Sequence, residues 1–269
     1  MGRNIKKYFL KKKTKCIYLS TKNFDLTKIT KSKIEKYFKK NSIIIYAAGK
    51  HRKFGDTVEL RDYNLRIFKS LLIELGNKLP NKIIFLSTVE VYGDKKRLKI
   101  NEKSSLNPLN LYAEGKLFQE NELKKFSKKN KINFNILRLP GFYGKDDKNS
   151  IISKMYLFFK NRLKIKFITN GDELRDYVFI NDLVKIINFF VKNKNQKFYG
   201  IFNIVQGKSF KIKKYLFYLK KNLNSDKNFI FGKKKGFNLR FDNKKLNIFL
   251  IKNNFKFLSH KDSIKKEYN

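Results

Sequence analysis

Tyr112 and Lys116 form the arrangement in this sequence that most directly suggests catalysis. They lie four residues apart in a stretch, 111–129, whose apolar residues recur at helical spacing, and on a helix that spacing places both side chains on one face. A free phenol titrates near ~10. An ammonium fixed beside it stabilises the phenolate, so Tyr112 can exchange a proton with a substrate hydroxyl near neutral pH. Both residue types are abundant here, so chance spacing is the alternative explanation of the pair alone.

Two hydroxyl residues, Ser87 and Thr88, follow an apolar run in the segment LSTVEVYG at residues 86–93. The run predicts a buried strand, and a parallel sheet presents its ligands at the carboxyl ends of its strands. A hydroxyl at such an end can hydrogen-bond a reacting oxygen and orient it for proton transfer. The alternative is that either side chain only caps the strand.

Short apolar runs alternate with amphipathic stretches along the chain, as expected for strand–helix–strand units. The runs predict buried strands at residues 16–19, 43–47, 83–87, 134–139 and 201–205. The amphipathic stretches predict helices at residues 58–76 and 111–129. The pattern therefore favours an α/β fold built on a parallel sheet.

The order of the motifs resembles the extended short-chain dehydrogenase/reductase family, which includes nucleotide-sugar 4-epimerases, 4,6-dehydratases and 4-ketosugar reductases. Thr88 falls at the family's catalytic hydroxyl. Tyr112 and Lys116 resemble its general acid/base and the partner lysine that also holds the nicotinamide ribose. Arg175, in the segment RDYVFIND, resembles the arginine that binds the substrate diphosphate, and a planar fork of donors suits phosphate oxygens. Further matches are YAAG at 46–49, LRLPGFYG at 137–144, FDNKK at 241–245 and the segment 258–264.

The resemblance implies a Rossmann-type sheet that binds a nicotinamide dinucleotide, followed by a small carboxyl-terminal substrate lobe. We expect the dinucleotide-binding domain at residues 1–145, joined by about 178–205. The substrate lobe is expected at residues 146–177 and 206–269. The reaction implied is hydride transfer at a sugar carbon, either 4-epimerisation or reduction of a 4-ketosugar.

The resemblance also implies the residues that contact the ligands. Glu90 and Arg175 are the expected contacts with a nucleotide-diphosphate sugar. The expected contacts with the cofactor are Gly2, Lys22, Asp25, Leu26, Ala47, Ala48, Gly49, Asn64, Ser87, Tyr112 and Lys116. We expect Thr88, Tyr112 and Lys116 to converge on one cleft, lined by Ala48 and Gly49.

Three departures from the family pattern narrow the function. Lys22 stands where an NAD-selective member usually has an acidic residue, and it tolerates a 2′-phosphate, so the sequence slightly favours NADP over NAD. Glu90 stands alone where the dehydratases carry an acid pair, which argues against 4,6-dehydration. Gly141 occupies a position at which many epimerases have an asparagine, so the substrate contact there is open.

The amino terminus also departs from the family pattern. A dinucleotide-binding fold opens with a strand and a glycine-rich turn that brings backbone amides to the pyrophosphate. This sequence starts at Met1-Gly2, which resembles the third glycine of that turn and the helix after it. The missing strand would lie between those predicted at 16–19 and 43–47. Either the start was placed too far downstream, which we favour, or the chain is a truncated relic.

Composition bounds the remaining alternatives. A net charge of +42, from 64 Lys and Arg against 22 Asp and Glu, can signal a nucleic-acid partner. The lysines are spread along the whole chain without an aromatic-and-basic RNA motif, so a nucleic-acid role is the weaker reading. Cys16 is the single cysteine, and no metal site and no membrane span are expected, which fits a cytoplasmic protein. A catalytically impaired remnant is the other alternative, and a homodimer is one candidate assembly.

Overall fold

The structure is a computed structural model, and it describes residues 1–50, 54–76, 78–94, 99–144, 147, 150–160, 167–227 and 229–268. The chain forms two compact units. The first consists of Met1–Gly93, Ser105–Arg138 and Asn188–Phe202, and the second of Asp94–Ser104, Leu139–Ile187 and Asn203–Asn269. Described residues within 94–104, 139–144 and 178–187, which the sequence analysis assigned to the dinucleotide-binding domain, group with the second unit.

A four-stranded sheet forms the centre of the first unit. Its strands are β1 (Ile43–Tyr46), β2 (Lys82–Thr88), β3 (Asn133–Leu139) and β7 (Gly200–Asn203), in the order β1-β2-β3-β7. β1 runs parallel to β2, with Ile43 opposite Lys82 and Tyr46 opposite Phe85. Every residue of β2 is buried, as expected for a strand covered on both faces. The structure confirms the strands predicted at these four places.

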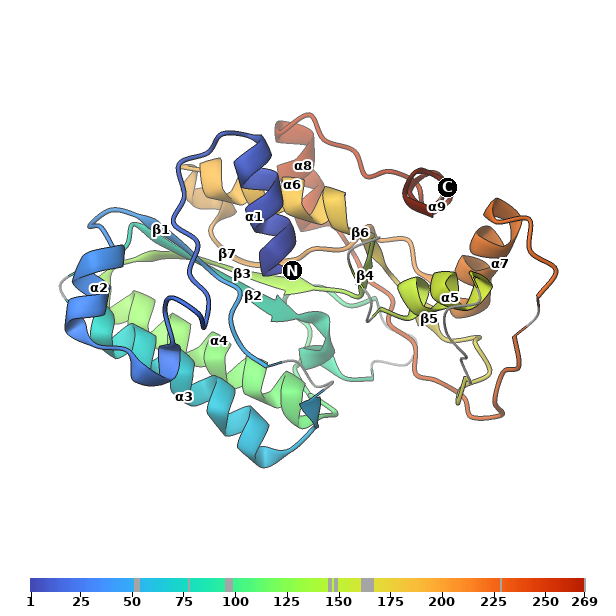
Figure 1. The fold of residues 1–269 in the computed structure, drawn as a ribbon, viewed down its shortest axis with the longest axis horizontal. Helices are drawn as coiled ribbons and strands as arrows, with labels where there is room; N and C mark the ends of the chain where they lie inside the picture. The colour runs from blue at the N-terminus through green and yellow to red at the C-terminus, as the bar shows by residue number, and fades with distance from the viewer. Residues whose placement is uncertain are drawn as a thin grey trace. The chain divides into compact units, whose positions relative to one another are not determined.

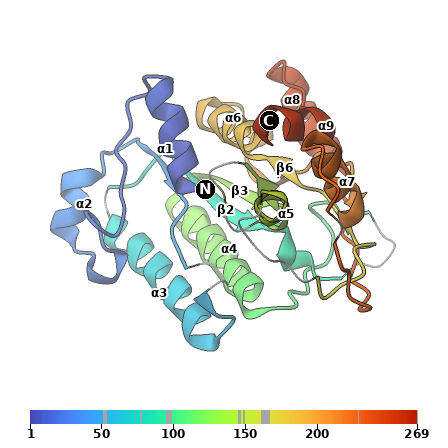
Figure 2. The same ribbon diagram turned by 45° about the vertical axis from the view of Figure 1, so that its right-hand side comes forward.

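Helices cover both faces of this sheet. α3 (Val58–Leu75) and α4 (Leu111–Asn130) pack against each other on one face, and α1 (Gly2–Lys11) lies on the other, as Figures 1 and 2 show. α2 (Lys31–Tyr37) and the short 3-10 helix η1 (Leu26–Lys28) contact α3. The helices predicted at 58–76 and 111–129 are therefore confirmed.

Local sequence explains where α3 and α4 begin and what they bury. Thr57 Oγ1 accepts a hydrogen bond from Leu60 N, and Asn110 Oδ1 accepts one from Ala113 N; such caps typically contribute ~1 kcal/mol each. The inner face of α3 presents Phe68, whose ring centroid lies 5.2 Å from that of Phe85 on β2. Burying a side chain of this size contributes roughly 1.5–3 kcal/mol.

The strand predicted at residues 16–19 is wrong. This segment has no regular secondary structure, and Cys16 and Ile17 are exposed, Ile17 by 57%. β1 is instead the terminal strand of the sheet, and its Ile43 is 39% exposed. An apolar run becomes a strand only when a neighbouring strand takes up its backbone hydrogen bonds. Leu19, the last residue of the run, packs against the core cluster of the first unit instead.

The second unit contains two small sheets and a set of helices. β4 (Phe142–Tyr143) pairs parallel with β6 (Val178–Phe179), and β5 (Leu174–Arg175) pairs antiparallel with β8 (Phe210–Lys211). The helices are α5 (Ile151–Phe159), α6 (Ile180–Lys192), α7 (Ile212–Asn222), α8 (Lys244–Lys252) and α9 (His260–Tyr268). The end of α6, from Asn188, belongs to the first unit and is followed by the 3-10 helix η4 (Gln196–Phe198).

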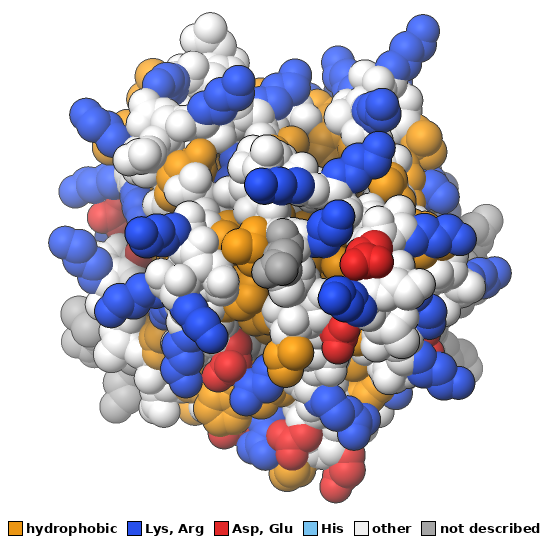
Figure 3. Space-filling model, turned by 90° about the vertical axis from the view of Figure 1, so that its left-hand side faces the viewer, with side chains coloured by type: hydrophobic (Ala, Val, Ile, Leu, Met, Phe, Trp, Pro, Cys, Tyr) orange, Lys and Arg blue, Asp and Glu red, His pale blue; other side chains and the backbone are white. Residues whose placement is uncertain are grey.

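Basic side chains are spread over one face of the molecule. On the face shown in Figure 3, Lys and Arg side chains lie among hydrophobic and uncharged ones across the whole view rather than in one patch. No helix in the described part of the chain is long and apolar enough to cross a membrane.

Candidate active site

The carboxyl end of β2 presents two buried hydroxyl side chains, Ser87 and Thr88. The chain then turns into a 3-10 helix, η3 (Val89–Tyr92), for which Thr88 is the N-cap residue. Thr88 Oγ1 accepts a hydrogen bond from Glu90 N at 3.2 Å. Thr88 therefore does have a capping role, as the sequence analysis allowed, and the element that it caps is η3. This role leaves the hydroxyl proton available for donation, because the oxygen only accepts in this bond.

Lys116 reaches the same strand end from α4. Its Nζ donates a hydrogen bond to Leu86 O at 3.1 Å and lies 4.8 Å from the centroid of the Phe85 ring. The side chain is 8% exposed. Burial lowers the pKa of Lys116 to about 8, and the carboxylate of Glu120 opposes that shift. The structure thus places the predicted lysine beside the residue that precedes Ser87.

Tyr112 lies in the first turn of α4, four residues before Lys116, and is partly buried. Its backbone N donates to Asp56 Oδ1 at 3.0 Å. The start of the helix is fixed by Asn110, whose Nδ2 donates to Glu90 Oε2 at 3.0 Å while its Oδ1 caps the helix. Asn110 therefore ties the helix that carries Tyr112 to the turn that follows Thr88. The sequence analysis missed Asn110, although an asparagine before an amphipathic stretch is a cap signal.

A buried ionic network supports this strand end, and the sequence analysis missed it too. Glu120 on α4 and Arg138 on β3 are 0% and 1% exposed. Arg138 donates from Nε to Glu120 Oε1 at 3.1 Å and from Nη2 to Glu120 Oε2 at 2.7 Å. Its Nη1 donates to Tyr92 Oη at 2.7 Å. Ser87 Oγ donates to Glu120 Oε1 at 2.5 Å, so the hydroxyl of Ser87 serves this network.

The loop after β1 is held by Asn64 from α3. Asn64 Oδ1 accepts from Lys50 N at 2.7 Å, and its Nδ2 donates to Lys50 O at 2.9 Å. Gly49 has a φ of +123°, and a Cβ there would lie 3.0 Å from Asn64 Oδ1, so a larger residue would be strained. Ala47 is exposed and Ala48 is half-buried beside it. Asn64 therefore fixes the shape of the predicted cofactor-lining loop.

The remaining predicted cofactor residues lie near the amino terminus. Gly2 is exposed at the start of α1, and a Cβ at this position would have no neighbouring atom within 4 Å. Lys22 is also exposed. Asp25 caps η1 by accepting hydrogen bonds from Thr27 N and Thr27 Oγ1, and the Thr27 N–H lowers the pKa of this carboxyl. Leu26 packs against the core cluster of the first unit.

The donor types on β2 and α4 fit the ribose and nicotinamide part of a dinucleotide. Lys116 supplies an ammonium and Thr88 a hydroxyl at the end of β2, and Tyr112 supplies a second hydroxyl from the helix that carries Lys116. Among the described residues, no cluster of His, Cys, Asp and Glu is arranged to hold a metal ion.

Arg175 belongs to the second unit, on β5. Its Nη1 donates to Leu174 O at 2.9 Å and also to Phe237 O, and the guanidinium lies 4.6 Å from the centroid of the Phe237 ring. The next residue, Asp176, is buried and accepts hydrogen bonds from three consecutive backbone N–H groups at residues 206–208. Burial raises the pKa of Asp176 to about 6 while those bonds oppose the shift. Asp176 thereby anchors the strand that carries Arg175.

Gly141 is a glycine for steric reasons. A Cβ at this position would lie 2.2 Å from Cε1 of Tyr177, which is far inside contact distance. An asparagine at this position does not fit unless Tyr177 moves.

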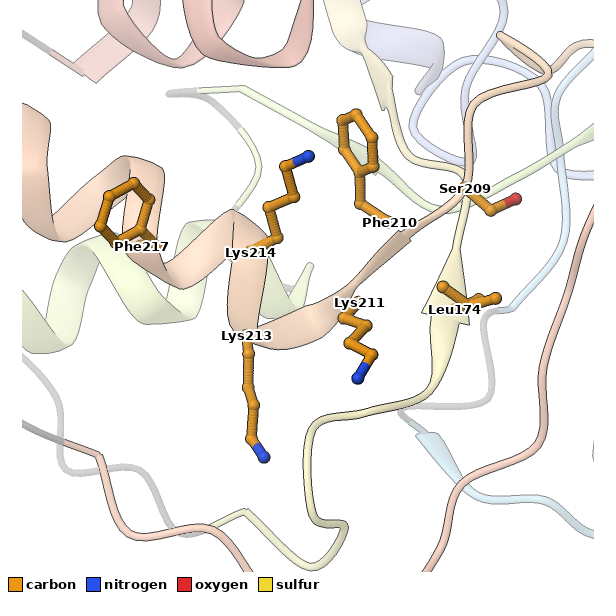
Figure 4. A pocket seen from close by; sticks show the side chains of 7 residues that line it. All are labelled: Leu174, Ser209, Phe210, Lys211, Lys213, Lys214 and Phe217. Atoms are coloured by element: carbon orange, nitrogen blue, oxygen red, sulfur yellow. The ribbon is translucent and has the colours of Figure 1, made fainter.

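The second unit also has an open pocket of about 440 Å³, shown in Figure 4. It is lined by Leu174, Ser209, Phe210, Lys211, Lys213, Lys214 and Phe217. None of the predicted site residues lines it. Asp172 pairs with both Lys211 and Lys213, and the Lys214 ammonium lies 3.9 Å from the centroid of the Phe210 ring.

Comparison with known sequences gives one family match and several relatives. The model of the NAD dependent epimerase/dehydratase family matches residues 1–204. ADP-L-glycero-D-manno-heptose-6-epimerase of Brachyspira hyodysenteriae is 32% identical over 135 residues, covering 47% of this chain and 42% of the relative. The dTDP-D-glucose 4,6-dehydratase of Dictyostelium discoideum is 30% identical over 176 residues, covering 59% and 41%. The matches thus span less than half the length of these curated relatives.

Solved structures share the fold at lower identity. UDP-glucuronic acid 4-epimerase from Bacillus cereus, solved with UDP-glucuronic acid and NAD, superposes with a TM-score of 0.78 at 20% identity. That superposition covers 98% of this chain and 83% of the other. The likeness concerns the fold.

Proposed function

This chain belongs to the NAD dependent epimerase/dehydratase family, and we propose that it acts on a nucleotide-diphosphate sugar by hydride transfer at a sugar carbon, as a 4-epimerase or a 4-ketosugar reductase. One observation carries the proposal. The buried Lys116 ammonium bonds the backbone at the end of β2, next to the Ser87–Thr88 pair and one helical turn from Tyr112. This arrangement supports a tyrosine acid/base at the strand end.

Each residue of the group has a distinct role. Tyr112 takes or returns the proton of the sugar hydroxyl, and Lys116 stabilises the phenolate that this transfer requires. Thr88 donates its hydroxyl proton to the sugar oxygen and orients it. Lys116 and the Gly49 loop hold the ribose and nicotinamide of the dinucleotide. When bound, the nicotinamide supplies the hydride acceptor or donor that the side chains lack.

The substrate and the form of the cofactor follow from residues farther along the chain. Arg175 binds the diphosphate, because the guanidinium fork matches phosphate oxygens. Lys22 is exposed, and an ammonium there suits the 2′-phosphate of NADP. Glu90 contacts the sugar side of the site and accepts from Asn110. Val89 is 3% exposed and apolar beside it, so the site lacks the acid pair of a 4,6-dehydratase.

Turnover with defined sugar nucleotides tests this proposal. The purified protein is incubated with UDP-, dTDP-, ADP- and GDP-linked hexoses, with NAD or NADP present. Epimerisation is followed by proton NMR of the anomeric and H4 signals. Reduction of 4-keto derivatives is followed by loss of NADH or NADPH absorbance. We expect conversion of at least one substrate class. A correctly folded protein that binds a dinucleotide but converts none of them contradicts the proposal.

A further inference from the structure

Among the described residues of the first unit, the Glu120–Arg138 pair is the most deeply buried ion pair. Both side chains are at most 1% exposed, and two parallel hydrogen bonds of 2.7 and 3.1 Å join them. Taking two charges out of water is expensive, and apolar residues of similar volume often serve stability equally well. A contribution to stability is therefore a poor explanation for the presence of this ion pair. The other contacts of Glu120 and Arg138 indicate a different role.

These contacts are with residues at the carboxyl end of β2 and just after it. The Oε1 atom of Glu120 accepts the Ser87 hydroxyl as well as Arg138 Nε. Glu120 lies four residues after Lys116 on the same face of α4. Arg138 also bonds the hydroxyl of Tyr92, the last residue of the turn that follows Thr88. One ion pair thus touches β2, β3, α4 and η3.

The surroundings of Lys116 offer its ammonium little other support. Its described contacts are one carbonyl, Leu86 O, and the face of the Phe85 ring. Burial lowers the pKa of Lys116 to about 8, and Glu120 is the group that raises it. Titratable and charged groups on α4 and on the elements packed around it include Arg61 on α3, Glu90 and Tyr92 on η3, Tyr112, Glu114 and Glu120 on α4, and Arg138 on β3. Of these, Arg61 and Glu114 pair with each other, and Arg138 is cationic.

We propose that Glu120, clamped by Arg138, is a positioning residue that keeps the Lys116 ammonium charged and fixes the strand end at Ser87. Arg138 prevents Glu120 from forming a closed pair with Lys116, so the lysine retains donors for a ribose or a phenolate. The inference rests on the proposed role of Lys116 in dinucleotide binding and proton transfer.

A neutral double variant tests the inference. Removal of one partner alone leaves a buried unpaired charge and endangers folding. The double variant Glu120→Gln with Arg138→Met removes both charges at similar volume. The readout is the pKa of Lys116 in the ligand-free protein, from the ¹³Cε shift of ¹³C-lysine during a pH titration. The Lys116 signal is assigned by its loss in Lys116→Met. The pKa of Lys82 is also lowered to about 8 by burial, so the Lys82 signal is assigned separately, by its loss in Lys82→Met.

We expect the double variant to fold and its Lys116 to titrate at a lower pH than in the wild-type protein, because Glu120 is the group that raises the pKa of Lys116. Glu122→Gln is the matched control, because Glu122 lies on the same helix but pairs with Lys69 and Lys125; it should leave the Lys116 titration unchanged. A folded double variant with a wild-type Lys116 titration overturns the inference. An unfolded double variant also overturns it, because the pair would then be required by the fold itself.

The same titration separates this inference from the proposed function. It is measured without substrate or dinucleotide, so it decides the role of Glu120 even if the wild-type protein converts no sugar nucleotide. Where turnover is found, the alkaline limb of its pH profile should move to lower pH in the double variant. Glu122→Gln should keep the wild-type profile.

Discussion

A buried ammonium at the end of β2 makes the stability of the protein depend on pH. The pKa of Lys116 is lowered by burial from 10.5 to about 8. Below pH 8 the folded protein holds this charge at a cost. Between pH 8 and 10.5 the folded chain releases the proton before the unfolded chain does, so the cost disappears as pH rises. A difference of this size corresponds to a ceiling of about 3 kcal/mol.

We therefore expect Lys116→Met to be more stable relative to wild type at pH 7 than at pH 10.5. The free energy of unfolding of both proteins, from urea denaturation at pH 7, 9 and 10.5, checks this. A difference between the two proteins that stays constant over this range would show that the ammonium is not desolvated.

Gly141 gives a second test at the level of one residue. Gly141→Asn places a Cβ 2.2 Å from Cε1 of Tyr177 and should disturb the β4–β6 pair, because Gly141 O accepts from Val178 N. Overpacking of this kind typically costs 1–3 kcal/mol, so we expect a melting temperature lower by roughly 2–8 °C. Tyr177→Ala in the same chain should recover part of the loss. Calorimetry of the wild type and the two variants checks it, and an unchanged melting temperature in Gly141→Asn would refute the steric explanation.

Motif residues were predictable from the sequence, but the residues that support them were not. Thr88, Tyr112 and Lys116 have recognisable types and spacing. Glu120 and Arg138 look like solvent-facing charges until the sheet places β3 beside α4. A charge inside an apolar strand such as NFNILRL is the one sequence signal that a buried partner exists, because an unpaired charge there would be prohibitively costly.

Among the secondary-structure elements, β2 and the end of α6 are joined by one lysine. Lys82 Nζ donates hydrogen bonds to Phe190 O at 2.6 Å and to Asn193 O at 2.7 Å. The last carbonyl groups of a helix have no N–H partner within the helix, so the lysine supplies donors at this end. A cation there also opposes the negative end of the helix dipole. We expect Lys82→Met to lower the free energy of unfolding by about 1–3 kcal/mol.

The control for this variant must account for net charge, since removing any lysine from a chain of +42 reduces repulsion. Lys39→Met removes an exposed lysine just after α2 and should leave stability within about 0.5 kcal/mol of wild type. Urea denaturation at pH 7 compares the three proteins. Equal stability of Lys82→Met and Lys39→Met would mean that the carbonyl contacts contribute nothing.

Element prediction failed where the outcome depends on a neighbour distant in sequence. Four apolar runs became strands because each found a partner, whereas the run at 16–19 did not. The two-residue strands of the second unit carry no periodic signal at all, since pairs such as Leu174–Arg175 with Phe210–Lys211 are set by the surrounding loops. Capped amphipathic stretches, such as those of α3 and α4, were predictable because their signals are local.

Over the whole molecule, the charge of +42 acts against folding through self-repulsion. Salt screens such repulsion, with a Debye length that falls from about 30 Å at 0.01 M to about 8 Å at 0.15 M. We expect the melting temperature to rise by several degrees between 10 and 200 mM NaCl. A melting temperature that falls with salt would mean that specific ion pairs outweigh the repulsion.

Turnover by Tyr112→Phe tests the central claim most directly, because this change removes one oxygen and little else. The account predicts that wild type converts a sugar nucleotide and that Tyr112→Phe loses at least about 100-fold in turnover. The dissociation constant for the dinucleotide, from calorimetric titration, should stay within about twofold. Turnover of Tyr112→Phe at the wild-type rate, with the dinucleotide bound, would contradict the assignment of Tyr112 and the proton-transfer mechanism built on it.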